Sequence, residues 1–133
     1  MAGRFAYLDS SAFLKLVVAE PGSPALRQAL VRWPERVSAA LLRAETARAL
    51  RRSENGDYLP AARRLFRAVH LIRLDAALLD RAGDLGPSGL RTLDAIHLAA
   101  ALDLGDDLGV MFTYDARLRH AAEDCGVEVD APV

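Results

Sequence analysis

The chain has 133 residues, of which 52% are hydrophobic and 26% are charged, and its net charge at pH 7 is −1. This composition is typical of a soluble globular domain, and the small net charge gives no overall attraction to nucleic acid or to membranes. Cys125 is the only cysteine, which excludes an intramolecular disulfide and a cysteine-based metal site. Asp9 and Lys15 interrupt the apolar N-terminal stretches, so we expect no signal peptide, no membrane contact and a cytoplasmic protein.

The charges are unevenly distributed along the chain. Residues 1–74 contain 13 Lys or Arg against 6 Asp or Glu, whereas residues 75–133 contain 4 against 12. This asymmetry indicates either a basic surface for an anionic partner with an acidic cluster elsewhere, or solvated faces that segregate by chance.

The first half of the chain predicts strands and helices in alternation. An apolar run over 5–8 predicts a strand, and it ends at Asp9, Ser10 and Ser11, which are good helix-capping residues. A helix over 12–19 then stops at Pro21 and Gly22. The elements that follow are a helix over 23–32, a short strand over 37–39, a helix over 41–53 and a helix over 58–69.

The second half continues the alternation, with a strand over 70–74, a helix over 76–82 and a loop over 83–89. A helix over 93–102 follows, and the clearest strand of the sequence covers 109–114 and ends on Asp115. The chain closes with a helix over 116–124 and an edge strand over 127–129. This order predicts a single α/β domain over 1–133, with a central, mostly parallel, twisted sheet of four to five strands and helices on both faces.

The helix over 93–102 poses the main chemical question of the sequence. Asp94 and His97 are its only polar residues, and a helix that is apolar all round lies in a protein interior. It is far shorter than the roughly 20 residues that a membrane span needs. Burying an ionised carboxylate without a partner costs several kcal/mol or more, so Asp94 must face a cation or hydrogen-bond donors, or stay protonated.

Four acidic residues have simple explanations one at a time. Asp9 and Asp115 are candidate helix caps, and Asp94 is a first-turn acid after a Thr92 cap. Glu45 has Arg48 at i+3 for a surface ion pair, although Glu45 also falls on an inward-facing stripe of its helix.

Taken together, the same acids indicate a metal site. The carboxyl ends of parallel strands meet at one edge of the sheet, where such sheets bind ligands, and Asp9, Asp94 and Asp115 are all expected there. Converging carboxylates repel one another unless a cation is present. Oxygen ligands without a cysteine or histidine cluster suit Mg²⁺ or Mn²⁺, and either ion would support hydrolysis of a phosphodiester.

Four motifs in order resemble the PIN domain, and more narrowly the VapC toxins of bacterial and archaeal toxin–antitoxin pairs. They are Tyr7 to Ala12, Arg43 to Glu45, Thr92 to Ala99 and Phe112 to Leu118. The resemblance implies a metal-dependent endoribonuclease whose acidic quartet is Asp9, Glu45, Asp94 and Asp115. It implies that Asp9 and Asp94 hold the main metal, helped by Asp115, and that Glu45 orients or deprotonates the attacking water or holds a second metal.

The resemblance also implies hydroxyl groups beside the site at Ser10 and Thr113. Arg48 and Arg52 are candidates for contact with substrate phosphates or an antitoxin carboxylate, or are simply solvated. We expect His97 to have a structural role. The implied partners are RNA and a cognate VapB-type antitoxin, and the implied assembly is a homodimer or a complex with the antitoxin.

Three alternatives remain on the sequence. A PIN-like module that binds a partner without catalysis is compatible with the fold, although the complete quartet disfavours it. A metal-dependent phosphatase of the haloacid dehalogenase type requires an aspartate two residues after Asp9, where Ser11 stands. A receiver-like signalling domain requires an adjacent acidic pair after the first strand and a lysine at the last strand, and both are missing.

Overall fold

The computed structural model describes residues 3–133, and it is built around a five-stranded sheet in which every neighbouring pair of strands is parallel. The strand order is β3-β2-β1-β4-β5, so β1 lies in the centre. The strands are β1 (Phe5–Leu8), β2 (Glu35–Ala39), β3 (His70–Ile72), β4 (Leu108–Phe112) and β5 (Val129–Asp130). The prediction of an α/β fold with a parallel sheet is therefore confirmed, and the sheet is fully rather than mostly parallel.

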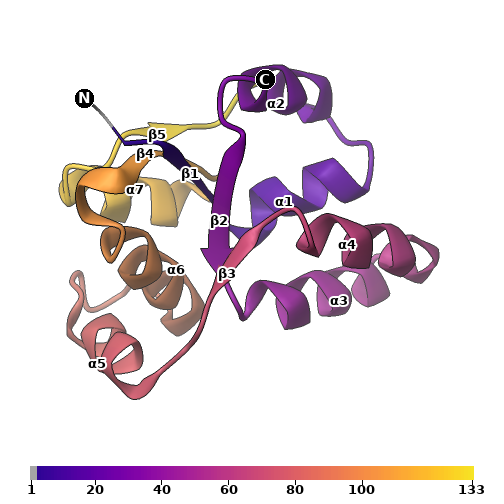
Figure 1. The fold of residues 1–133 in the computed structure, drawn as a ribbon. Helices are drawn as coiled ribbons and strands as arrows, with labels where there is room; N and C mark the ends of the chain where they lie inside the picture. Colours follow the sequence, from indigo (N-terminus) through magenta and orange to yellow (C-terminus); the bar gives the residue numbers. More distant parts are fainter. Residues whose placement is uncertain (1–2) are drawn as a thin grey trace.

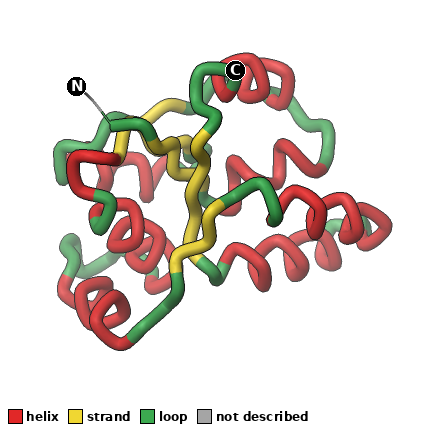
Figure 2. The backbone as a smooth tube through the Cα atoms, in the orientation of Figure 1, coloured by secondary structure: helices red, strands yellow, loops and turns green. Residues whose placement is uncertain are grey.

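Seven α-helices connect these strands within the described residues (Figures 1 and 2). They are α1 (Ser10–Val17), α2 (Ser23–Leu30), α3 (Leu42–Arg52), α4 (Leu59–Phe66), α5 (Ala76–Asp84), α6 (Thr92–Leu102) and α7 (Ala116–Asp124). Short 3₁₀ turns precede α4 at Gly56–Tyr58 and β4 at Gly105–Asp107. No helix in residues 3–133 is long and apolar enough to cross a membrane.

The two central strands send alternate side chains to opposite faces of the sheet. Tyr7 and Met111 pack with α5, α6 and α7, whereas Leu8 and Phe112 pack with α1 and α2. A third cluster joins α1 to α3 and α4, where the Phe13 and Phe66 rings stack with centroids 5.1 Å apart. Burial on both faces explains why β1 and β4 are continuous apolar runs without polar alternation. In Figure 1, α5 to α7 lie on one side of the strands and α1, α3 and α4 on the other.

Several predicted boundaries differ from the structure by one to three residues. The strand predicted over 109–114 is β4 at Leu108–Phe112, and the final strand is Val129–Asp130 rather than 127–129. The helix predicted over 58–69 begins at Leu59 and ends at Phe66. Helix ends fray and share their last turns with 3₁₀ geometry, which the apolar pattern of a sequence does not resolve.

The prediction that Thr92 caps α6 is wrong. The N-cap is Arg91, whose backbone is extended and whose carbonyl accepts the Ala95 N–H at 2.9 Å, and no side chain caps this end. The prediction that this helix is buried is confirmed, because every residue from Ala95 to Ala101 is buried. Asp94 lies in the first turn of α6, immediately before this buried segment.

Gly109 in β4 is required by close packing. A Cβ at this position would overlap the Trp33 ring and lie 2.6 Å from the Gly3 carbonyl oxygen. We therefore expect Gly109→Ala to lower the free energy of unfolding by about 1–3 kcal/mol, measured by urea denaturation. Gly83→Ala in α5 is the matched control, because a Cβ there meets nothing within 4 Å and should stabilise the helix by about 0.5–1 kcal/mol. Equal stability of Gly109→Ala and the native chain would show that Trp33 relaxes freely.

Candidate active site

The strand order reverses between β1 and β4, and the candidate site lies at the carboxyl ends of these two strands. Strands β2 and β3 lie on one side of β1, and strands β4 and β5 lie on the other. Such a switch point leaves a crevice at the sheet edge where ligands of open α/β sheets bind. Asp9 follows β1 directly, and Thr113 and Asp115 follow β4.

Asp9 is the most deeply buried acid of the site, with 3% of its surface exposed. Its Oδ1 accepts hydrogen bonds from the Ala12 N–H at 3.0 Å, which caps α1, and from the Ser11 hydroxyl at 2.7 Å. Its Oδ2 accepts a hydrogen bond from the Thr113 hydroxyl at 2.6 Å. Burial raises the pKa of Asp9 above its ordinary value, and these donors and the nearby His97 only partly oppose that effect.

Asp94 and Asp115 face a common cation, the Arg91 guanidinium. Arg91 Nε lies 3.7 Å from Asp94 Oδ2, and Arg91 Nη2 lies 3.6 Å from Asp115 Oδ2. Burial and the charge of Asp115 raise the pKa of Asp94, Arg91 opposes this, and Asp9 adds a further increase. Asp9, Asp94 and Asp115 therefore form one electrostatically coupled group, with Arg91 at its solvent side.

Asp115 also caps α7. Its Oδ1 accepts hydrogen bonds from the Arg117 N–H at 2.8 Å and the Leu118 N–H at 3.1 Å, while its Oδ2 faces Arg91. Thr113 links the two capping acids, because its hydroxyl donates to Asp9 and accepts from the Asp115 N–H at 3.1 Å. One oxygen of Asp115 thus fixes the start of a helix and the other remains in the site.

Glu45 reaches the site from α3 and contacts His97 rather than the predicted surface partner Arg48. Glu45 Oε1 lies 2.7 Å from His97 Nε2, and 16% of the glutamate side chain is exposed. Glu45 also lines a cleft of about 450 Å³ with Arg48 and Arg52, and Ser10 of α1 lines it as well. A second hollow of about 300 Å³ shares Glu45 and Leu93 with this cleft and continues to Arg91 and Asp94.

The donor set fits a hard divalent cation. Among residues 3–133, no three Asp, Glu, His or Cys side chains form a ready-made metal site. Mg²⁺ keeps several waters, however, and needs only one or two protein carboxylates. Asp9 and Asp94 are carboxylates whose ionised forms are disfavoured by burial, and Arg91 already occupies a cation position beside Asp94 and Asp115. A divalent ion would relieve the same repulsion more strongly.

Three residues of the site were not among the predicted functional residues. Ser11, rather than Ser10, places its hydroxyl on Asp9, and Arg91 contacts two of the acids. Tyr7 contacts His97 from the buried centre of β1, with its hydroxyl oxygen 2.7 Å from Nδ1. Of these three residues, only Arg91 could have been found from the sequence. It precedes Asp94 by three positions, which is a spacing that brings opposite charges together on a helix.

A family model of the PIN domain matches residues 6–124. The chain is 53% identical over 127 residues to a Mycobacterium tuberculosis protein named Ribonuclease VapC46, a match covering 95% of this chain and 96% of the relative. It is 36% identical over 133 residues to Ribonuclease VapC35 of the same species, with coverage of 95% and 96%.

Two solved structures share the fold. One is M. tuberculosis VapC20, described as a toxin that cleaves the sarcin–ricin loop, with a TM-score of 0.72 and 17% identity over 87% of this chain and 94% of that one. The other is VapBC2 from Rickettsia felis bound to a DNA fragment from their promoter, with a TM-score of 0.68 and 10% identity over 97% of this chain and 99% of that one.

Proposed function

We propose, from the premise that this chain belongs to the PIN-domain family and within it to the VapC-type ribonuclease toxins, that it is a Mg²⁺- or Mn²⁺-dependent endoribonuclease. The resemblance seen in the four sequence motifs is confirmed by the family match and by the relatives of the chain. What we propose beyond the family is the metal dependence, the roles of the site residues and the RNA substrate.

The observation that carries the proposal is the convergence of Asp9, Asp94 and Asp115 at the switch point of the sheet. Their mutual electrostatic effect is visible in the raised pKa of Asp94, to which burial contributes most and the charges of Asp115 and Asp9 also contribute. The ionised form of Asp94 is disfavoured by burial and by two neighbouring carboxylates, so this position is suited to hold a cation.

Asp9 and Asp94 would hold the main cation, and Asp115 would contact the same cation directly or through a water. When bound, the cation supplies charge neutralisation at the phosphodiester and a water of lowered pKa. Glu45, which lines the same hollow as Asp94, would orient or deprotonate that water, or hold a second cation. Thr113 and Ser11 keep the Asp9 carboxylate oriented through their hydroxyl groups.

The cleft beside Glu45 supports an RNA strand as the substrate. Arg48 and Arg52 supply positive charge along one wall, and Ser10 adds a hydroxyl at the end near Asp9. Arginine pairs well with phosphate oxygens, and a basic groove is the usual way to follow a single-stranded backbone. The exposed side chain of Leu93 lies where the cleft and the second hollow meet, which suits contact with a base or with an apolar residue of an inhibitor.

The proposed partner is a VapB-type antitoxin, as in type II toxin–antitoxin systems. The support is the similarity of this fold to a chain of the Rickettsia felis VapBC2 structure, together with a cleft that combines apolar side chains with two arginines. An antitoxin carboxylate would pair with Arg48 or Arg52. Cytoplasmic localisation and assembly as a homodimer, or as a complex with the antitoxin, belong to the same proposal.

The test is cleavage of total cellular RNA by the purified chain, freed of antitoxin. We expect discrete RNA fragments with Mg²⁺ or Mn²⁺ and intact RNA with EDTA. The Asp94→Asn variant, purified in parallel, controls for contaminating ribonucleases. Intact RNA under both metals, from a sample shown to be folded, would contradict the proposed activity.

A further inference from the structure

We propose that Tyr7 and His97 are positioning residues that hold the Glu45 carboxylate in a fixed orientation beside the cleft, an inference that rests on the proposed nuclease function. His97 Nε2 lies 2.7 Å from Glu45 Oε1, and His97 Nδ1 lies 2.7 Å from the Tyr7 hydroxyl. Both ring nitrogens are therefore engaged. Only 1% of the His97 surface is exposed and Tyr7 is fully buried, so the hydrogen bond between these two side chains is screened from water.

The direction of the two hydrogen bonds follows from the Glu45 carboxylate, which can only accept. His97 Nε2 therefore carries a proton and donates it to Glu45 Oε1. In the neutral ring, Nδ1 is then an acceptor and receives the Tyr7 O–H. Tyr7 and Glu45 thus hold the same tautomer of His97 from its two sides.

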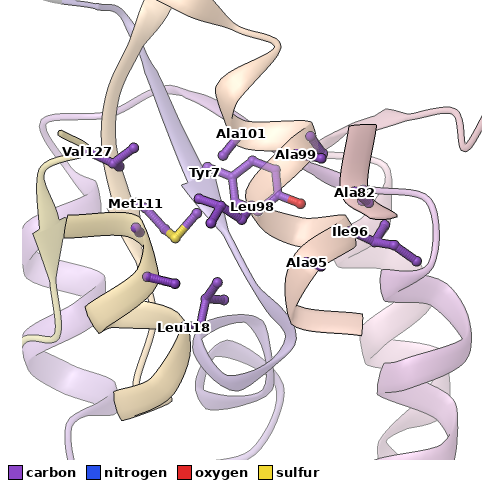
Figure 3. Close-up of a cluster of buried hydrophobic side chains, with 14 of the residues drawn as sticks. Tyr7, Ala82, Ala95, Ile96, Leu98, Ala99, Ala101, Met111, Leu118 and Val127 are labelled. Atoms are coloured by element: carbon purple, nitrogen blue, oxygen red, sulfur yellow. The ribbon is translucent and has the colours of Figure 1, made fainter. Parts of the chain in front are cut away.

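Tyr7 is a rigid anchor for this arrangement. Its ring is fully buried in the core cluster of β1, α6 and α7, among Leu98, Ala99 and Met111 (Figure 3). It meets the His97 ring edge-to-face, with centroids 5.7 Å apart and an interplanar angle of 79°. The hydrogen-bonded series from Tyr7 through His97 to Glu45 is therefore anchored at one end by a core residue of the central strand.

The arrangement joins three elements that are far apart in sequence. Tyr7 and His97 are separated by 90 positions, and His97 and Glu45 by 52. Fixing a glutamate side chain costs conformational entropy, and here that cost is met on folding rather than during the reaction. A purely structural role would not require these three hydrogen-bonded polar side chains. An apolar side chain would fill the buried position of His97 in α6 without the cost of desolvating three polar groups.

Tyr7→Phe is the most selective test, because it removes one hydroxyl and keeps the ring. We expect kcat for RNA cleavage to fall about 10- to 100-fold, as for a misplaced catalytic group, with KM changed less than about twofold. Mn²⁺ binding measured by calorimetry should stay within about twofold of the native value, since Asp9 and Asp94 are untouched. His120→Ala, at an exposed histidine, is the matched control and should cleave normally.

The second test asks whether donation to Glu45 is what matters. His97→Gln keeps a side-chain N–H donor, whereas His97→Ala removes it, so Gln should restore part of the kcat that Ala loses. In the native chain, ¹⁵N spectra of the histidine rings should show His97 with its proton on Nε2. Native kcat in Tyr7→Phe, equal kcat in the two His97 variants, or a proton on Nδ1 would each overturn the inference. Failure of the native chain to cleave RNA would instead overturn the proposed function, and the ring spectra would still report the tautomer.

Discussion

Asp94→Asn is expected to lower RNA cleavage by about a thousandfold or more while leaving the fold intact. The variant removes one anionic oxygen from the three-acid group, and a metal-activated reaction loses several kcal/mol of transition-state stabilisation with its cation. Asparagine has the same shape, and the ionised form of Asp94 is disfavoured by burial and by Asp115, so the substitution should not unfold the chain. The measurement is the initial rate of cleavage in Mn²⁺, with circular dichroism to verify folding.

Asp106→Asn provides the matched control for this variant. Asp106 is exposed and lies in the 3₁₀ turn before β4, so the same change of charge there should leave the cleavage rate within about twofold of the native rate. Native activity in Asp94→Asn would remove Asp94 from the proposed cation site. Equal losses in both variants would point to net charge rather than to the site.

Mn²⁺ is expected to raise the melting temperature of the native chain at pH 7 by about 10 °C. Binding to the folded state alone at 100 times Kd adds about 2.7 kcal/mol, which corresponds to a shift of this size for a small domain. In Asp94→Asn the shift should be nearly absent. A calorimetric or fluorescence melt with and without the ion measures both, and an equal shift in the two proteins would place the bound ion elsewhere.

The metal-free chain should show the corresponding pH dependence. The pKa values of Asp9 and Asp94 are raised above 3.8 in the folded state, chiefly by burial, so the folded chain binds these protons more tightly than the unfolded chain does. Their contribution favours folding at acidic pH and is lost as pH rises above 3.8 through the folded-state pKa values. In EDTA, Asp94→Asn should therefore melt at a higher temperature than the native chain at pH 7, and the difference should shrink toward pH 4. A constant difference across this range would contradict the shift.

The sequence was sufficient to predict the fold because its strongest signals were local. Apolar runs without alternation marked β1 and β4 as buried parallel strands, with Asp9 directly after β1 and Asp115 three positions after the end of β4. Alternation of strands and helices then determined the sheet type, and the right-handed connection rule placed the strand ends at one edge. Helix boundaries were less certain, as α4 shows, because the residues flanking it are compatible with both helix and turn.

The acidic residues show that capping and function need not be competing explanations. Asp9 and Asp115 were candidates for one or the other, and the structure gives both of them a capping bond. Asp115 divides the tasks between its two oxygens, and Asp9 receives hydroxyl groups in addition to the backbone. A cap fixes the position of a carboxylate, which is what a binding site also needs.

The remaining contacts could not be predicted because they depend on long-range packing. The link from Tyr7 to His97 follows from burial of α6 against β1, and no local pattern specifies which face of that apolar helix turns inward. The contact of Ser11, rather than the predicted Ser10, with Asp9 has a similar cause. Both residues begin α1, and the one that meets Asp9 is Ser11, whose hydroxyl also accepts the Tyr114 N–H at 2.9 Å from the loop after β4.

The central place of β1 has a consequence for synthesis of the chain. Asp9 is translated before β4, which pairs beside it, and before Asp94, Thr113 and Asp115. The carboxylate group is therefore incomplete until residue 115 is available to fold. Under the proposed function, the chain cannot cleave RNA before that point of its own synthesis.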